Sequence, residues 1–238
     1  TTASSPYEAR LAFEEFGSRA HTYTPAYEEE TFQEMLRCSS VITFNSLSQY
    51  ERFRPSVEKW NTTHDMSQSV CCGLRVNPEY SEIETALYDP CAPGSRFGVL
   101  STSLPSQLPK DIRGFHIHCH CESSSYAFEN TLKHIEQKFA KWFNQLEWIN
   151  FGGGHHITRD DYNRELLIKC ITEAKSLFDV EVYLEPGEAV ALNAGYSVTT
   201  ILDKTTSGDT TNLILDISAA CHMPDVIEMP YRPPLFAS

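Results

Sequence analysis

The stretches GFHIHCHCESSS (114–125), WINFGGGHH (148–156) and VYLEPGE (182–188) decide the fold of this chain. Each is a short apolar run that stops at a small or polar motif bearing histidine, glycine or glutamate. Three earlier runs stop in the same way, near Tyr27, Asn45 and Asn77. In (β/α)8 barrels the functional groups lie where strands hand over to loops at the carboxyl-end face, so these motifs are typical of that face.

Helical segments separate the apolar runs. Segment 28–39 has the spacing of an amphipathic helix, and segments 123–146 and 160–178 share the helical pattern. Strands that alternate with helices of this length predict βαβ units and a parallel sheet. The sequence therefore predicts an α/β fold over 1–192: a partial TIM-type (β/α)8 barrel that comprises strands three to eight and is incomplete at its N-terminus.

The pattern changes from residue 193 onward. Two β-branched runs within 196–218 flank a polar turn at Gly208, which predicts a β-hairpin. We expect 193–238 to be the first hairpin of an all-β carboxyl-terminal domain that is truncated here. Since the chain also starts without methionine, we expect it to be an internal fragment of a longer protein.

Composition narrows the class of protein. The 238 residues carry a formal net charge of −13, which disfavours binding to nucleic-acid phosphates. No apolar run approaches the about 18 residues of a transmembrane helix, and the first residues lack the basic and apolar parts of a signal peptide. Eight cysteines are scattered without a disulfide framework, which predicts a reducing, cytoplasmic setting.

Two motifs at expected strand ends suit an anionic ligand and a proton or cation. Gly152, Gly153 and Gly154 follow an apolar strand and precede a helix. Glycines let backbone N–H groups wrap a phosphate, although a tight strand-to-helix turn is the structural alternative. Glu185 ends the next strand, where a carboxylate can accept a proton or pair with a cation, or simply cap a helix.

Three histidines share the strand before the glycine run. His116, His118 and His120 alternate along it, so all three are expected on one face. Such a face can hold zinc, stack on a planar cofactor, or consist of core histidines bonded to the backbone. Arg75 and Asn77 end an earlier strand, where a structural role is the simpler interpretation.

Taken together, six segments resemble those of the carboxynorspermidine/carboxyspermidine decarboxylases: GLRVNPEYSEIE, PCAPGSRFGV, GFHIHCHCESSSYAFENTLKHIEQ, WINFGGGHHITRDDYN, EPGEAV and CHMPDVIEMPYRP. The resemblance covers essentially the whole chain. These enzymes are members of the alanine-racemase-like class that uses pyridoxal 5'-phosphate (PLP) and includes ornithine and diaminopimelate decarboxylases. The resemblance implies a PLP-dependent carboxy-lyase of polyamine biosynthesis, which forms norspermidine or spermidine.

The resemblance assigns cofactor roles residue by residue. His116 matches the histidine that stacks on the PLP ring, and Gly152, Gly153 and Gly154 match the phosphate-binding turn. Glu185 matches the acid that pairs with the pyridine nitrogen and keeps it protonated, so that the ring can accept the electrons left when CO₂ departs. No metal is implied.

Two carboxylates are the candidates for substrate binding. Glu188 stands where enzymes similar to ornithine decarboxylase have an arginine after EPG, and Asp225 follows the second run of the expected hairpin. A protonated polyamine is held best by spaced carboxylates, through charge-assisted hydrogen bonds. We therefore expect Glu188 and Asp225 to bind amines of the substrate.

The catalytic residues of the class are expected outside this chain. The class attaches PLP to a lysine at the end of the first barrel strand, and none of the eight lysines here ends an expected strand. The class takes its proton-donor cysteine from a later loop of the β domain, across a homodimer interface. The resemblance therefore implies a homodimer in the full-length enzyme.

Two other functions stay open. One is a metal-dependent barrel hydrolase built on His116, His118 and His120, which would leave the GGG and EPG motifs unexplained. The other is a non-catalytic relative that lacks the lysine and binds a partner. Stoichiometric zinc in the purified protein would favour the first, and a lysine-bearing strand upstream would dismiss the second.

Overall fold

The computed structural model describes residues 1–228 and 231–236, and the chain divides into two units, Thr1–Leu192 and Asn193–Ser238. None of the helices in these described ranges combines the length and apolarity that crossing a lipid bilayer requires.

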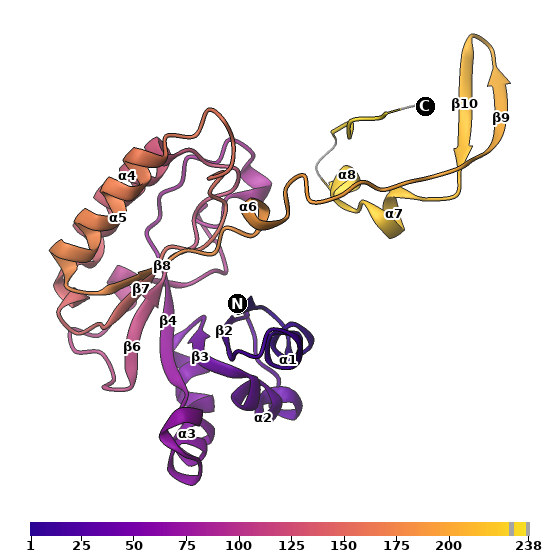
Figure 1. Cartoon of the computed structure of the whole chain (residues 1–238). Coiled ribbons are helices and arrows are strands. Elements are labelled where there is room, and N and C mark those ends of the chain that lie inside the picture. Colours follow the sequence, from indigo (N-terminus) through magenta and orange to yellow (C-terminus); the bar gives the residue numbers. More distant parts are fainter. Residues whose placement is uncertain (229–230, 237–238) are drawn as a thin grey trace. The chain divides into compact units, whose positions relative to one another are not determined.

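Seven strands of the first unit pair in parallel in the order β1-β2-β3-β4-β6-β7-β8 (Figure 1). An eighth, β5, pairs with β4 alone. Residues at both ends of this order line one cavity, so the sheet curves as a barrel does. The predicted partial barrel is confirmed. The strands are β1 (Thr2–Ala3), β2 (Ala20–Tyr23), β3 (Ser39–Phe44), β4 (Cys71–Asn77), β5 (Val99–Leu100), β6 (Ile112–His116), β7 (Trp148–Asn150) and β8 (Glu181–Tyr183).

The sheet contains two strands more than the six that the sequence predicts, β1 and the short β5. β1 pairs with β2 through only two positions, Thr2 with His21 and Ala3 with Thr22. The expectation of six strands, numbered three to eight, therefore leaves out a strand at the edge. A strand this short has no apolar run and no period, so the sequence carries no signal for it.

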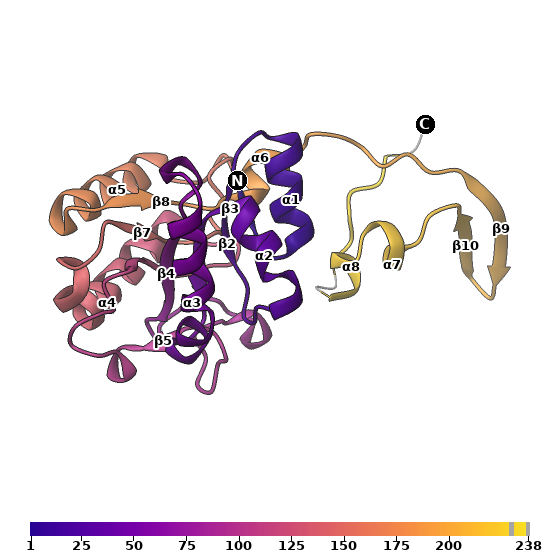
Figure 2. The ribbon, with the colours of Figure 1, turned by 90° about the horizontal axis from the view of Figure 1, so that it is seen from below.

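Helices cover the outside of the sheet (Figure 2). Four of them begin at a side chain that accepts a hydrogen bond from the backbone N–H three residues later: Ser5, Ser46, Ser124 and Asn163. Such caps satisfy an N–H group that has no partner inside the helix. The helices are α1 (Pro6–Glu15), α2 (Glu29–Cys38), α3 (Leu47–Thr63), α4 (Ser125–Phe143), α5 (Arg164–Phe178) and α6 (Gly187–Ala191), with short 3₁₀ turns at Met66–Gln68, Ala86–Tyr88 and Ser101–Ser103.

The floor of the barrel is a tryptophan packed on two glycines. The Trp148 side chain lies so close to Gly114 and Gly73 that a Cβ there would sit 2.0 and 2.4 Å from its ring atoms. Its Nε1 donates to Cys71 Sγ at 3.5 Å. The two glycines therefore make room for a ring that closes the barrel below the site.

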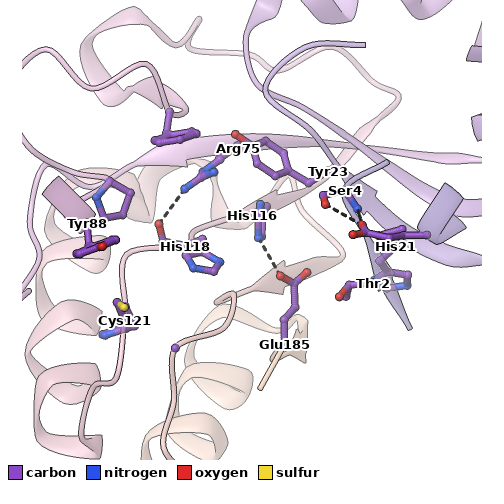
Figure 3. A pocket seen from close by; sticks show the side chains of 16 residues that line it. Thr2, Ser4, His21, Tyr23, Arg75, Tyr88, His116, His118, Cys121 and Glu185 are labelled. Atoms are coloured by element: carbon purple, nitrogen blue, oxygen red, sulfur yellow. Dashed lines mark hydrogen bonds and ion pairs between the residues drawn. The ribbon is translucent and has the colours of Figure 1, made fainter. Parts of the chain in front are cut away.

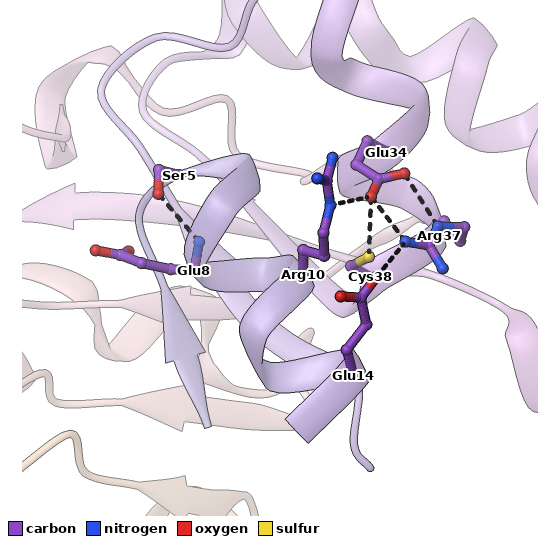
Figure 4. Close-up of polar contacts among 7 residues, drawn as sticks. All are labelled: Ser5, Glu8, Arg10, Glu14, Glu34, Arg37 and Cys38. Atoms are coloured by element: carbon purple, nitrogen blue, oxygen red, sulfur yellow. Dashed lines mark hydrogen bonds and ion pairs between the residues drawn. The ribbon is translucent and has the colours of Figure 1, made fainter. Parts of the chain in front are cut away.

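Ion pairs attach α1 to α2 (Figure 4). The buried side chains of α1 are only the small Ala9 and Ala12. Arg10 Nε lies 3.0 Å from Glu34 Oε1, and Arg37 Nη2 lies 2.7 Å from the same oxygen. Hydrogen bonds from Arg37, then from Arg10, hold the pKa of Glu34 at about 2. Glu34 thus stays ionised and joins the two helices at neutral pH.

The second unit contains the predicted hairpin. β9 (Ile201–Ser207) and β10 (Thr210–Leu215) pair antiparallel around Gly208, whose φ is +55°. β10 ends at Leu215, so Asp225 does not directly follow the strand as expected. Ser218 caps a short helix, α7 (Ala219–His222), and Asp225 opens another, α8 (Asp225–Glu228), because a capping serine and Pro224 start helical turns after the hairpin.

Candidate active site

A cavity of about 690 Å³ opens at the carboxyl ends of the strands of the first unit (Figure 3). Its walls come from β1, β2, β4, β6 and the segments after β6, β7 and β8. They include Thr2, His21, Tyr23, Arg75, His116, His118, Cys121 and Glu185. The face predicted to carry chemistry is the face that is hollowed.

Glu185 lies in this cavity as a carboxylate. Asn150 Nδ2 donates to its Oε1 at 2.7 Å, and His116 Nε2 lies 3.5 Å from its Oε2. Burial alone would raise the pKa of Glu185, but interactions with His116 and Asn150 outweigh burial and bring the pKa to about 2. The side chain keeps 16% exposure, so a charged acceptor faces the cavity at neutral pH.

His116 is buried, as is His120, and lines the cavity beside Glu185. It is 3% exposed and packs its ring 5.0 Å from the ring of Tyr23. Apart from the long contact with Glu185, neither ring nitrogen has a hydrogen-bond partner among the described residues. The ring therefore contacts Glu185 while leaving little of its own surface exposed.

His118 faces the cavity beside the glycine run. Gly153 N–H donates to its Nδ1 at 3.3 Å, so Nδ1 carries no proton and Nε2 carries it in the neutral ring. Burial, followed by the charges of His116 and Arg75, lowers the pKa of His118 to about 4. The ring is partly exposed and neutral at physiological pH.

His120 lines the same cavity as His116 and His118, but only His116 lies on the strand that was expected to carry all three. β6 ends at His116, so the two-residue alternation does not continue to His120. Its ring instead packs 5.0 Å from His155 and 5.9 Å from Phe128. Burial lowers the pKa of His120 to about 3, which marks a neutral core histidine at the edge of the cavity.

The glycine run is a strained turn that only glycine adopts easily. Gly152 and Gly154 have φ values of +71° and +81°. A Cβ on Gly154 would lie 2.3 Å from the His120 carbonyl oxygen, and one on Gly152 would lie 2.8 Å from the His118 ring. Gly152 N–H donates to Asn150 Oδ1 at 2.9 Å, so this turn also orients the amide that holds Glu185.

The predicted substrate residues lie in different units. Glu188 belongs to α6 in the first unit, is 45% exposed, and has its Oε2 2.5 Å from His156 Nε2. Asp225 belongs to α8 in the second unit and is exposed. Its role toward the substrate stays a prediction.

Arg75 joins the site although the sequence favoured a structural role. It is 6% exposed, its guanidinium lies 4.6 Å from the ring centres of Tyr23 and Phe97, and Nη2 donates to the His118 carbonyl at 3.0 Å. A charged residue inside an apolar strand was the only available signal. Glu8, Tyr23 and Cys121 also line the cavity and had no motif to reveal them.

The cluster can bind either a cation or a protonated ring nitrogen. One nitrogen of His116, one of His118 and one oxygen of Glu185 lie within 4.8 Å of one another. Metal ligands have this chemistry, but so does an acid that faces a heterocycle. The choice between the two comes from comparison with known proteins.

No protein-family profile matches the chain. Individual relatives do. A carboxyaminopropylagmatine decarboxylase of Synechocystis is 43% identical over 98% of this chain and 58% of its own length. A carboxynorspermidine/carboxyspermidine decarboxylase of Campylobacter jejuni is 39% identical over 97% of this chain and 57% of its own.

The chain resembles these decarboxylases along almost its whole length. The structure of the C. jejuni carboxynorspermidine decarboxylase, solved with norspermidine, superposes with a TM-score of 0.82 at 37% identity. The superposition covers 97% of this chain and 57% of the C. jejuni chain. A lysine/ornithine decarboxylase of Vibrio vulnificus shares the fold, with a TM-score of 0.73 at 15% identity over 98% of this chain and 62% of its own. The predicted resemblance is confirmed, and the chain spans somewhat more than half the length of the relatives it matches. All of these relatives are named as decarboxylases.

Proposed function

We propose that this chain supplies the cofactor- and substrate-binding part of a PLP-dependent decarboxylase that acts on carboxylated polyamines. The observation that carries the proposal is Glu185, which Asn150 and His116 hold as a carboxylate at the cavity, beside the glycine turn. The names of the relatives at 39–43% identity support the substrate class.

The residues at the cavity fit PLP. A pyridine nitrogen stays protonated opposite a carboxylate, and a pKa of about 2 keeps Glu185 ionised across the physiological range. Gly154 lines the cavity, where a glycine backbone can approach a phosphate, and its missing Cβ makes room for the His120 carbonyl oxygen on the other side. When bound, PLP supplies the electron sink for the charge left on Cα as CO₂ leaves.

Each residue then has a distinct task. Glu185 holds the proton on the ring nitrogen. We assign the contact with the ring face to His118 rather than to His116, because His118 is partly exposed whereas His116, which also lines the cavity, is 3% exposed. Arg75, stacked between two aromatic rings, fixes the His118 backbone.

The substrate arm is the part of the proposal that depends on Glu188 and Asp225. A carboxylate at either position suits an ammonium group, and a guanidinium equally well. Carboxynorspermidine, carboxyspermidine and carboxyaminopropylagmatine are therefore the substrates to compare. We also propose a homodimeric, cytoplasmic enzyme, from the resemblance and from the free cysteines among the described residues.

The test is turnover by a full-length protein that contains this chain. Each of the three carboxylated amines would be supplied with and without PLP, and CO₂ release measured. We expect release that requires PLP and prefers at least one of the three over ornithine and diaminopimelate. Equal activity without PLP, or activity with added zinc alone, would contradict the proposal.

A further inference from the structure

We propose that His156 and Arg159 are positioning residues that hold Glu188 in place to receive a cationic group of the substrate. This inference rests on the proposed function and extends it to two residues that no motif singled out for a role. His156 follows the glycine turn, and Arg159 lies three residues later.

The contact between His156 and Glu188 joins a buried ring to an exposed acid. His156 Nε2 lies 2.5 Å from Glu188 Oε2 as an ion-pair contact without hydrogen-bond geometry, and the two side chains are 7% and 45% exposed. α6, which carries Glu188, has only five residues and buries none of them. The helix alone therefore fixes the carboxylate weakly, and the buried imidazole supplies the missing anchor.

Arg159 determines where the proton of His156 lies. Its Nη1 is 3.1 Å from His156 Nδ1, while its Nε and Nη2 are each 3.1 Å from an oxygen of Asp161. A guanidinium only donates, so Nδ1 must accept through its lone pair. The proton of the neutral ring is then on Nε2, which faces Glu188.

A proton on Nε2 suits a substrate-binding acid. The N–H dipole beside one carboxylate oxygen favours that position for the oxygen without adding a bond that a cationic group would have to displace. In the part of the chain that the structure describes, no hydrogen bond or ion pair engages the other oxygen. Glu188 is also close enough to Cys121, a cavity residue, to contribute to the raised pKa of that thiol after burial and Glu122.

The first test reads the tautomer of His156 in the full chain by ¹⁵N NMR of histidine-labelled protein. We expect a protonated Nε2 and an unprotonated Nδ1 at pH 8, and a mixture of tautomers in Arg159→Met. Arg113→Met is the matched control, since Arg113 is also 50% exposed and also pairs with an acid, Glu147. A proton on Nδ1, or an unchanged signal in Arg159→Met, would overturn the proposal.

The second test separates positioning from folding in the full-length enzyme. We expect His156→Leu to raise KM for the carboxylated polyamine by about tenfold with kcat within about twofold, because Glu188 would lose the close polar contact that positions it. His156→Gln, whose amide can donate in place of Nε2–H, should restore KM. Equal KM values in the two variants would refute positioning, whereas an inactive wild-type enzyme would refute the proposed function and leave the tautomer result standing.

Discussion

Replacing Gly114 by alanine tests the packing of the barrel floor. The new Cβ would lie 2.0 Å from Trp148 ring atoms, against about 3.5–4.0 Å for a carbon contact. Trp148 is 6% exposed and abuts Gly73 as well, so its ring has no space to move into. Overpacking costs roughly 1–3 kcal/mol, and an overlap of this size belongs at the upper end, about 3 kcal/mol.

The assay is thermal unfolding of the full chain followed by tryptophan fluorescence. A loss of about 3 kcal/mol corresponds to a Tm lower by roughly 6–12 °C for a unit of this size. Gly187→Ala is the control, because no atom lies within 4 Å of its added Cβ. In the Gly114→Ala protein, the second substitution Trp148→Leu replaces the indole by a smaller side chain. It should therefore recover part of the lost Tm. A Gly114→Ala protein as stable as the Gly187→Ala control would refute this packing.

Three further outcomes follow from the same structure. Burial holds the pKa values of His118 and His155 at about 4 and that of His120 at about 3, below the usual 6.5. Between these pH values the unfolded chain binds more protons than the folded chain. Stability in urea should therefore fall as the pH drops from 6.5 to 4, and less steeply in His155→Phe. Glu188→Ala or Asp225→Ala in the full-length enzyme should raise KM about tenfold or more without loosening PLP, through loss of a charge-assisted hydrogen bond; loss of PLP from Glu188→Ala would assign it to the phosphate instead. No lysine lines the cavity among the described residues, so borohydride reduction of the chain with PLP should leave no pyridoxyl group on a single lysine in peptide maps.

The carboxyl ends of the strands could be predicted because a change in the sequence pattern marks each of them. A parallel strand that is buried on both faces needs an unbroken apolar run, and its carboxyl end needs polar or glycine residues. This reasoning placed Glu185 and the glycine turn at the cavity. It failed for β1, because two residues that pair with a single neighbour leave no periodic signal.

Sequence patterns could not predict which side chains contact one another in the site. Alternation predicted one strand for His116, His118 and His120, but β6 stops at His116, and the segment after the strand carries the other two to the cavity. The pairing of His156 with Glu188 joins segments 32 positions apart, as their residue numbers show. Only the closure of neighbouring strands into a barrel brings such positions together, and no local motif encodes it.

The central claim is that Glu185 pairs with a protonated cofactor nitrogen, and Glu185→Gln in the full-length enzyme tests it most directly. The matched control is Glu181→Gln, which alters an acid on β8, the strand just before Glu185, whose partner is the surface Lys175. We expect Glu185→Gln to lower kcat by a factor on the order of 10²–10³ while the Kd for PLP changes only a few-fold, since the charge matters most as CO₂ leaves. A Glu185→Gln enzyme with the kcat of the Glu181→Gln control would contradict the account.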